Sequence, residues 1–155
     1  MTFTEIYDYL TDFNLVSVLV RLVLALVFSG VIGLEREKKR RAAGLRTYML
    51  VCVGAALVIM TDQYVFERLG GTSPTRMAAQ VLSGIGFLGA GTIIVTGSRQ
   101  VKGLTTAAGL WAAASMGVAL GAGFYEGAIL GFAAIAVVII FLHRVSDRVE
   151  INSRY

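Results

Sequence analysis

Five long apolar blocks carry almost no charge, and they constrain the fold more than any other feature of the sequence. They cover residues 14–34, 48–66, 77–96, 104–121 and 124–142. About 20 apolar residues in a helix are enough to cross the hydrocarbon core of a bilayer. Of all residues, 56% are hydrophobic and only 15% are charged. The sequence therefore predicts an all-α integral membrane protein with five transmembrane helices.

The positions of Lys and Arg predict how these spans are oriented. Most of the 14 basic residues fall in the loops after the first and third blocks and in the segment after the fifth. All three segments lie on one side of a five-span model, and short loops rich in Lys and Arg stay in the cytoplasm. We therefore expect the N-terminus outside and the C-terminus in the cytoplasm.

Three regions follow from this pattern. Residues 1–13 are expected to form an amphipathic surface segment, because Phe3, Ile6, Leu10 and Phe13 recur at helical spacing between acidic residues. This segment lacks the basic start of a cleavable signal peptide. Residues 14–142 form the five-helix transmembrane domain, and residues 143–155 form a short cytoplasmic tail.

The stretch "SGIGFLGAGTIIV" contains the spacing G-x-G-x-x-G at Gly84, Gly86 and Gly89. A dinucleotide site would need a strand before it, a soluble helix after it and an acidic residue about 20 positions on. The sequence has none of these, so we expect a membrane helix whose small residues allow close packing against the fourth span. That packing set is Ser83, Gly84, Gly86, Gly89, Ala90 and Gly91. The alternative is a broken or re-entrant helix around Gly84 to Gly91, as in ion-binding transporter sites.

Four polar residues are expected at depth in the outer leaflet. Arg21 lies inside the first block, Gln80 lies at a comparable depth, and Asp62 and Glu126 lie near the outer ends of the second and fifth blocks. Such residues form a hypothetical ion-binding or buried polar cluster. The alternatives are a purely structural salt bridge, or an Arg21 side chain that reaches to the membrane surface.

Other chemistry is not indicated. The lone Cys52 excludes an intrachain disulfide, and neither a metal-ligand pattern nor a nucleophile–base pair is recognisable. We expect no catalytic residues, no metal and no cofactor. The basic residues lie beside membrane spans, so nucleic acid is not an expected partner. The run "EREKKRRAAGLR" is explained by topology, and its charge density also suits anionic lipid headgroups or an acidic partner.

Several segments, taken in order, resemble one protein family. They are "RLVLALVFSGVIGLERE", "AGLRT", "SPTRMAAQVLSGIGFLGAGTII" and "VKGLTTAAGLWAAASMGVALGAG". The chain resembles the transmembrane domain of the MgtC/SapB family of bacterial inner-membrane proteins. The polar residues in these motifs, besides Arg21 and Gln80, include Glu35, Arg36, Arg46, Thr47, Arg76, Lys102 and Thr105.

The resemblance implies a multi-pass protein of the bacterial inner membrane that is linked to growth at low magnesium and, in pathogens, to virulence. It implies membrane lipids and other membrane proteins as partners, with the ATP synthase as one candidate. Ser73 stands where the family commonly has an aspartate. Many family members also carry a soluble C-terminal domain, and we expect this chain to be a short form without it.

The sequence thus predicts a regulatory membrane protein that acts through membrane partners and forms a homo-oligomer. The alternative is a cation transporter or channel of the Mg²⁺ type, with Arg21, Asp62, Gln80 and Glu126 along its path. A second alternative is a structural subunit of a membrane complex.

Overall fold

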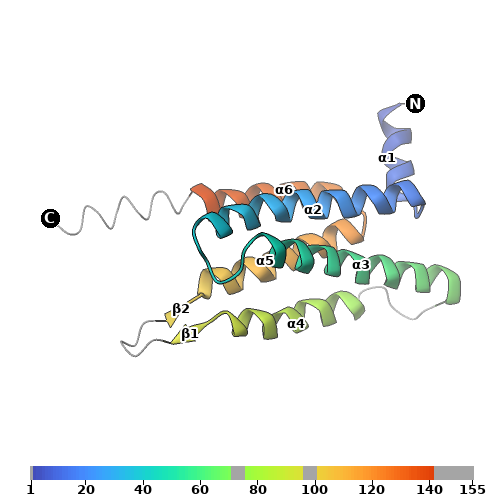
Figure 1. Cartoon of the computed structure of the whole chain (residues 1–155). Coiled ribbons are helices and arrows are strands. Elements are labelled where there is room, and N and C mark those ends of the chain that lie inside the picture. Colours follow the sequence, from blue (N-terminus) through green and yellow to red (C-terminus); the bar gives the residue numbers. More distant parts are fainter. Residues whose placement is uncertain (1, 71–75, 96–100, 142–155) are drawn as a thin grey trace.

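The computed structural model describes residues 2–70, 76–95 and 101–141, and nearly all of them are helical. The elements in chain order are α1 (Phe3–Thr11), α2 (Leu15–Lys38), α3 (Leu45–Leu69), α4 (Arg76–Gly91), β1 (Ile94–Val95), β2 (Val101–Lys102), α5 (Leu104–Gly121), α6 (Tyr125–Ala136) and the π-helical turn η1 (Val137–Phe141). Figure 1 shows that α2 to α6 alternate in direction along one axis, with α1 turned away from them. The α2–α3 loop and the β1–β2 pair therefore lie at one end, the basic end, and α1 lies at the opposite end.

Local side-chain chemistry fixes where the long helices begin and end. The Asn14 side chain accepts a hydrogen bond of 2.8 Å from the Ser17 backbone N–H, which caps the start of α2. The Glu37 carboxylate accepts one of 2.8 Å from the Leu45 N–H and so caps the start of α3 across the loop. Gly70 ends α3 with a φ of 69°, a left-handed conformation that glycine adopts without a steric penalty.

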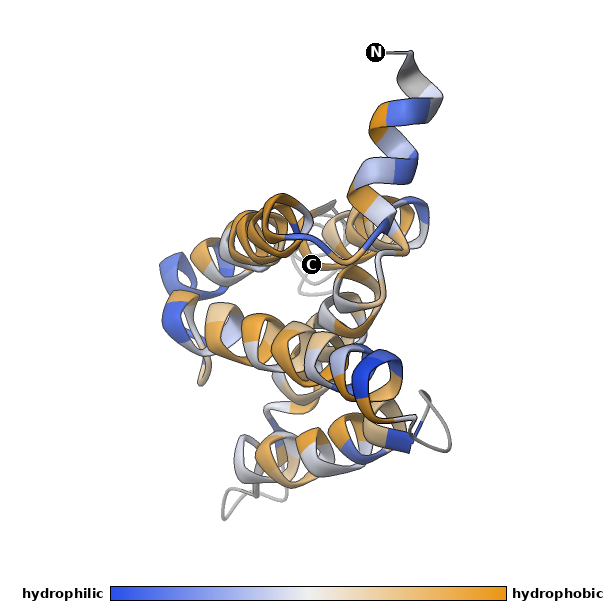
Figure 2. Cartoon of the chain, turned by 90° about the vertical axis from the view of Figure 1, so that its right-hand side faces the viewer, coloured by the Kyte–Doolittle hydropathy of each residue, from blue (hydrophilic) through white to orange (hydrophobic). Residues whose placement is uncertain are grey.

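The core lies where α2, α3 and α5 meet, and it contains many small residues. Ala25, Cys52, Ala56 and Ala113 are completely buried there, beside larger side chains such as Tyr48. Many other large apolar side chains point outward, for example Phe87, which is 84% exposed. Figure 2 shows mostly hydrophobic residues along the helices of the bundle, with several hydrophilic residues on α1. Such an apolar exterior is unfavourable in water and matches contact with lipid.

Within the described residues, three helices are long and apolar enough to cross a membrane: α2, α3 and α5. The apolar stretch Tyr125–Ile140 is shorter, and α4 has 16 residues. At 1.5 Å per residue, α4 covers roughly 24 Å, less than the ~30 Å hydrocarbon core. A mainly helical structure with apolar helices that could cross a membrane is confirmed, whereas the count of five spans and their orientation stay predictions.

The tightest helix contact joins α5 to α3. Gly109, Ala113, Gly117 and Gly121 are buried at four-residue spacing on α5. A Cβ added at Gly121 would lie 2.6 Å from the Ala56 carbonyl oxygen, and one at Gly117 would collide with the Cys52 carbonyl. The small residues of α5 that approach a neighbour most closely therefore face α3. The sequence had predicted close packing between the third and fourth spans instead.

Helix α4 runs unbroken through Gly84, Gly86 and Gly89 to Gly91, so the broken-helix alternative is wrong. It does lie against α5, but the close contact is made by Gly89, whose added Cβ would lie 3.5 Å from the Ala107 Cβ. An added Cβ at Gly84, Gly86 or Gly91 would meet nothing within 4 Å. Ser83 and Ala90 are exposed as well. Most of the expected packing set thus lies outside the α4–α5 contact.

The segment after α4 contains a feature that the sequence analysis missed. β1 and β2 pair antiparallel, with Ile94 opposite Lys102 and Val95 opposite Val101. This hairpin ends the helix earlier than the expected block 77–96. Ser73, where the family commonly has an aspartate, and the tail 143–155 lie outside the described residues.

Candidate functional site

A buried arginine lies at the α1 end of the bundle. The Arg21 residue is 1% exposed, and its guanidinium donates hydrogen bonds of 2.8 Å to the carbonyl oxygens of Thr11 and Gly121. Nη2 also lies 3.4 Å from the Leu10 carbonyl oxygen. We call this group, with Gln63 and Tyr125, the arginine junction.

The partners of Arg21 explain how its charge is tolerated without a carboxylate. Thr11 is the last residue of α1, and Gly121 is the last residue of α5. Carbonyls in the last turn of a helix lack intrahelical partners and carry the negative end of the helix dipole, about −0.5 charge per helix. One guanidinium therefore caps two helix C-termini, and their combined partial charges offset its own.

Two side chains and one glycine complete the arginine junction. The Gln63 Oε1 accepts a hydrogen bond of 3.1 Å from Nη1 of Arg21, and the Tyr125 hydroxyl donates one of 2.8 Å to the Leu10 carbonyl. Gly123 has a φ of 75°, and a Cβ there would lie 2.8 Å from Nη2 of Arg21. Both the turn and the space for the guanidinium therefore require glycine at this position.

The other three members of the expected outer cluster do not join Arg21. Gln80 is exposed on α4. Glu126 is exposed on α6, and its carboxylate accepts a hydrogen bond from the Tyr7 hydroxyl. This hydrogen bond is the main reason why the pKa of Tyr7 is raised above its ordinary value. Asp62 is 8% exposed, and its Oδ2 has no hydrogen-bond partner among the described residues. Arg21 is thus held by carbonyl groups, and the four residues do not form one cluster.

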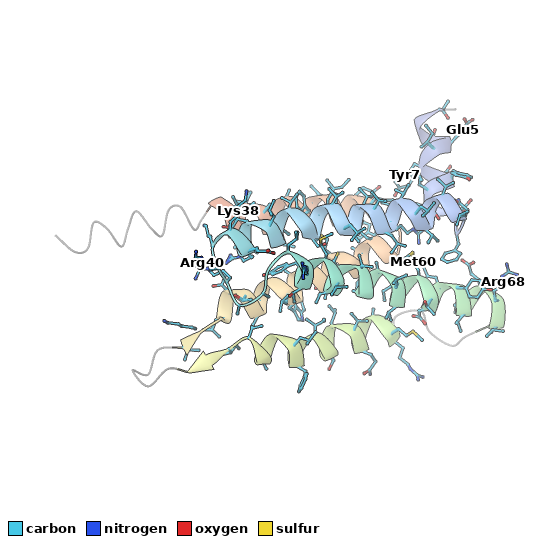
Figure 3. The ribbon with its side chains drawn as sticks, in the orientation of Figure 1. Glu5, Tyr7, Lys38, Arg40, Met60 and Arg68 are labelled. Atoms are coloured by element: carbon cyan, nitrogen blue, oxygen red, sulfur yellow. The ribbon has the colours of Figure 1, made fainter. Side chains whose placement is uncertain are left out.

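A second polar region lies at the basic end, where Figure 3 places Lys38 and Arg40. A pocket of about 660 Å³ opens between the end of α2, the start of α5 and η1. Its described lining includes four cationic residues, Arg36, Arg40, Arg41 and Lys102, and no acidic residue. We call it the basic pocket.

Buried polar groups lie beside the basic pocket. The Arg36 side chain is 4% exposed, and its Nε lies 3.4 Å from Oε2 of Glu35 without forming a hydrogen bond. Glu35 also pairs with the Lys39 ammonium at 2.8 Å. The Tyr48 hydroxyl is buried nearby on α3 without a partner. A buried polar group without a hydrogen bond destabilises the fold, and a ligand that supplies the missing hydrogen bond removes this cost.

The remaining motif residues are spread over both ends. Thr105 lines the basic pocket, whereas Arg46 and Thr47 line a neighbouring, more open depression with Glu37 and Gly44. Arg76 is exposed at the start of α4.

Three residues of the arginine junction were not predicted from the sequence: Gln63, Tyr125 and Gly123. The turn "GAGFYEG" was the available signal, since its glycines predict a tight corner beside a helix start.

These observations define a class: a helical membrane protein with a buried arginine at one end and a basic pocket at the other. The chain belongs to the MgtC family, whose model matches residues 22–148. It is 39% identical to "Putative magnesium transporter YhiD" of Escherichia coli K12, over 88% of this chain and 65% of that protein. It is 49% identical to "Protein MgtC" of Brucella abortus, over 75% of this chain and 45% of that protein.

A Synechocystis protein described as uncharacterized is 43% identical, over 83% of this chain and 53% of its own length. The chain therefore spans about half to two thirds of the length of these curated relatives. No solved structure matches it.

Proposed function

We propose that the chain is a regulatory protein of the bacterial inner membrane, a multi-pass member of the MgtC family that acts through other membrane proteins during magnesium limitation. The arginine junction is the observation that carries this proposal. It places a fixed positive charge inside the α1 end of the bundle, held by hydrogen bonds from Arg21 to α1, α3 and α5. A hydrated or bare Mg²⁺ ion passing that point would be repelled by the guanidinium.

Close packing along the bundle supports the same proposal. Gly117 and Gly121 bring α5 against the backbone of α3, so a side-chain-lined path does not fit between these two helices. A rigid, closed bundle suits a protein that binds partners through its outer surface. The ATP synthase is one candidate partner by family resemblance, and membrane lipids surround the apolar exterior.

We propose that copies of the chain associate through α4. Its outward face combines the open positions Gly84 and Gly91 with the exposed Phe87. Small residues on a lipid-facing helix allow a second helix to approach closely. A homo-oligomer formed in this way would use the small residues that α5 leaves uncovered.

A deletion strain of the host bacterium tests the regulatory proposal. We expect it to grow poorly at low magnesium and to recover when the wild-type chain or the Asp62→Asn variant is expressed. Recovery should occur without a change in the rate at which the cells take up Mg²⁺. Normal growth of the deletion strain at low magnesium would contradict the proposal.

Cation transport is the second candidate, and one observation favours it. The Asp62 carboxylate is buried with an unpartnered oxygen, and oxygen ligands of this kind bind hard cations. The name of the Escherichia coli relative points the same way. Under this candidate, the Asp62→Asn variant would fail to restore growth, and magnesium uptake would fall with it.

A further inference from the structure

The basic pocket combines two independent features that favour an anion. The first is its charge, since its described lining has four cationic side chains and no carboxylate. Among them, Arg36 lines the pocket and has a side chain buried to more than nine-tenths; its Nε lies 3.4 Å from Oε2 of Glu35 in an ion pair but makes no hydrogen bond among the described residues. A buried N–H donor without a hydrogen bond is costly until an acceptor reaches it.

The second feature is the start of α5. This helix of 18 residues begins at Leu104, and its N-cap, Gly103, provides no side-chain cap. Among the described residues, the first helical N–H group with a backbone partner is that of Ala107, which bonds to the Gly103 carbonyl. The N–H groups of the first turn and the positive end of the helix dipole therefore lie at the pocket, an arrangement that binds phosphate groups.

An apolar groove continues from the basic pocket. The groove has a volume of about 280 Å³ and runs between α5 and the α6–η1 helix, past Ala108, Ala112 and Ile135. Thr105, Val138 and Ile139 line both the groove and the pocket. One molecule could therefore occupy both, provided that it has an anionic group joined to an apolar chain.

We propose that the basic pocket and this groove form a binding site for an anionic phospholipid. The lipid phosphate lies between Arg36, Lys102 and the start of α5, and one acyl chain follows the groove along α5 and α6. Free phosphate would fill only the polar part, so the continuity of pocket and groove favours the lipid. This site does not depend on the proposed regulatory role.

Lipid binding to the purified full chain in a neutral detergent tests the proposal. Native mass spectrometry would count bound lipid during titration with phosphatidylglycerol, phosphatidylcholine or inorganic phosphate. We expect phosphatidylglycerol to bind at least about tenfold more tightly than phosphatidylcholine, since nearby basic residues add to the attraction of an anionic headgroup. Equal binding of the two lipids would overturn the proposal.

Variants separate the headgroup contact from the acyl contact. The change Lys102→Gln should weaken phosphatidylglycerol binding roughly fivefold, because one basic residue near the headgroup contributes about 1 kcal/mol. Arg46→Gln is the matched control, because Arg46 lines the neighbouring depression and not the basic pocket; its effect should stay below about twofold. A loss of the same size in the control would show attraction by the loop's general charge and refute a defined site.

The groove has its own variant. Ala112→Leu fills part of it and should weaken phosphatidylglycerol binding while leaving any binding of inorganic phosphate unchanged. If phosphatidylglycerol binds equally well to Ala112→Leu and to the wild type, the groove holds no acyl chain and the proposal is wrong. If inorganic phosphate competes with the lipid at equal affinity, the site recognises a free anion instead.

Discussion

Replacing Arg21 by methionine should destabilise the bundle strongly, although it removes a charge from an apolar environment. Methionine retains most of the apolar length of the side chain, but it donates no hydrogen bond. The carbonyls of Thr11 and Gly121 then lose their 2.8 Å partners at the ends of α1 and α5. An orphaned buried acceptor costs roughly 1–3 kcal/mol, so two of them predict a loss of roughly 2–6 kcal/mol in the free energy of unfolding.

The assay is unfolding in mixed micelles of increasing SDS content, followed by circular dichroism. Arg68→Met is the matched control, since Arg68 is exposed at the same end and should change the free energy by less than about 0.5 kcal/mol. Arg21→Lys should fall between the two, because an ammonium keeps the charge but lacks the planar fork that spans both carbonyls. An Arg21→Met protein as stable as the control would refute the capping role of the guanidinium.

The remaining predictions concern packing and hydrogen bonds. Gly117→Ala should destabilise the chain in the same assay by roughly 1–3 kcal/mol, because its Cβ would press on the α3 backbone; Gly54→Ala, which meets nothing within 4 Å, should not. Gly84→Leu should leave the fold intact and reduce self-association measured by cross-linking in membranes, whereas Gly131→Leu, where an added Cβ also meets nothing within 4 Å, should change neither; equal association of both variants would show that α4 is not the interface. Tyr125→Phe should cost about 1 kcal/mol through the lost bond to the Leu10 carbonyl, and no change in the unfolding midpoint would contradict this.

The helical membrane architecture could be predicted because it follows from apolar block length alone. Arg21 could be identified as a candidate site residue because a charged side chain inside an apolar block is rare. Its partners could not be predicted, because backbone carbonyls have no sequence signature. The expectation of a partner carboxylate led to Asp62 and Glu126, whereas two helix C-termini provide the compensation.

The sequence also could not predict which side of α4 or α5 contacts a neighbouring helix. Both α4 and α5 carry small residues at helical spacing on more than one side, so spacing alone does not select the contact face. The structure selects Gly109, Gly117 and Gly121 on α5 because they approach α3. The basic pocket could not be predicted from the sequence either. Its residues come from the α2–α3 loop, β2 and the start of α5, and only the fold brings these segments together.

Magnesium flux into proteoliposomes that contain only the purified chain tests the central claim most directly. If Arg21 closes the α1 end of the bundle and the protein acts through partners, uptake should equal that of empty liposomes. Arg21→Lys should give the same result, since it keeps the positive charge. Saturable Mg²⁺ uptake by the wild type that is lost in Asp62→Asn would contradict this account and establish a cation path through the bundle.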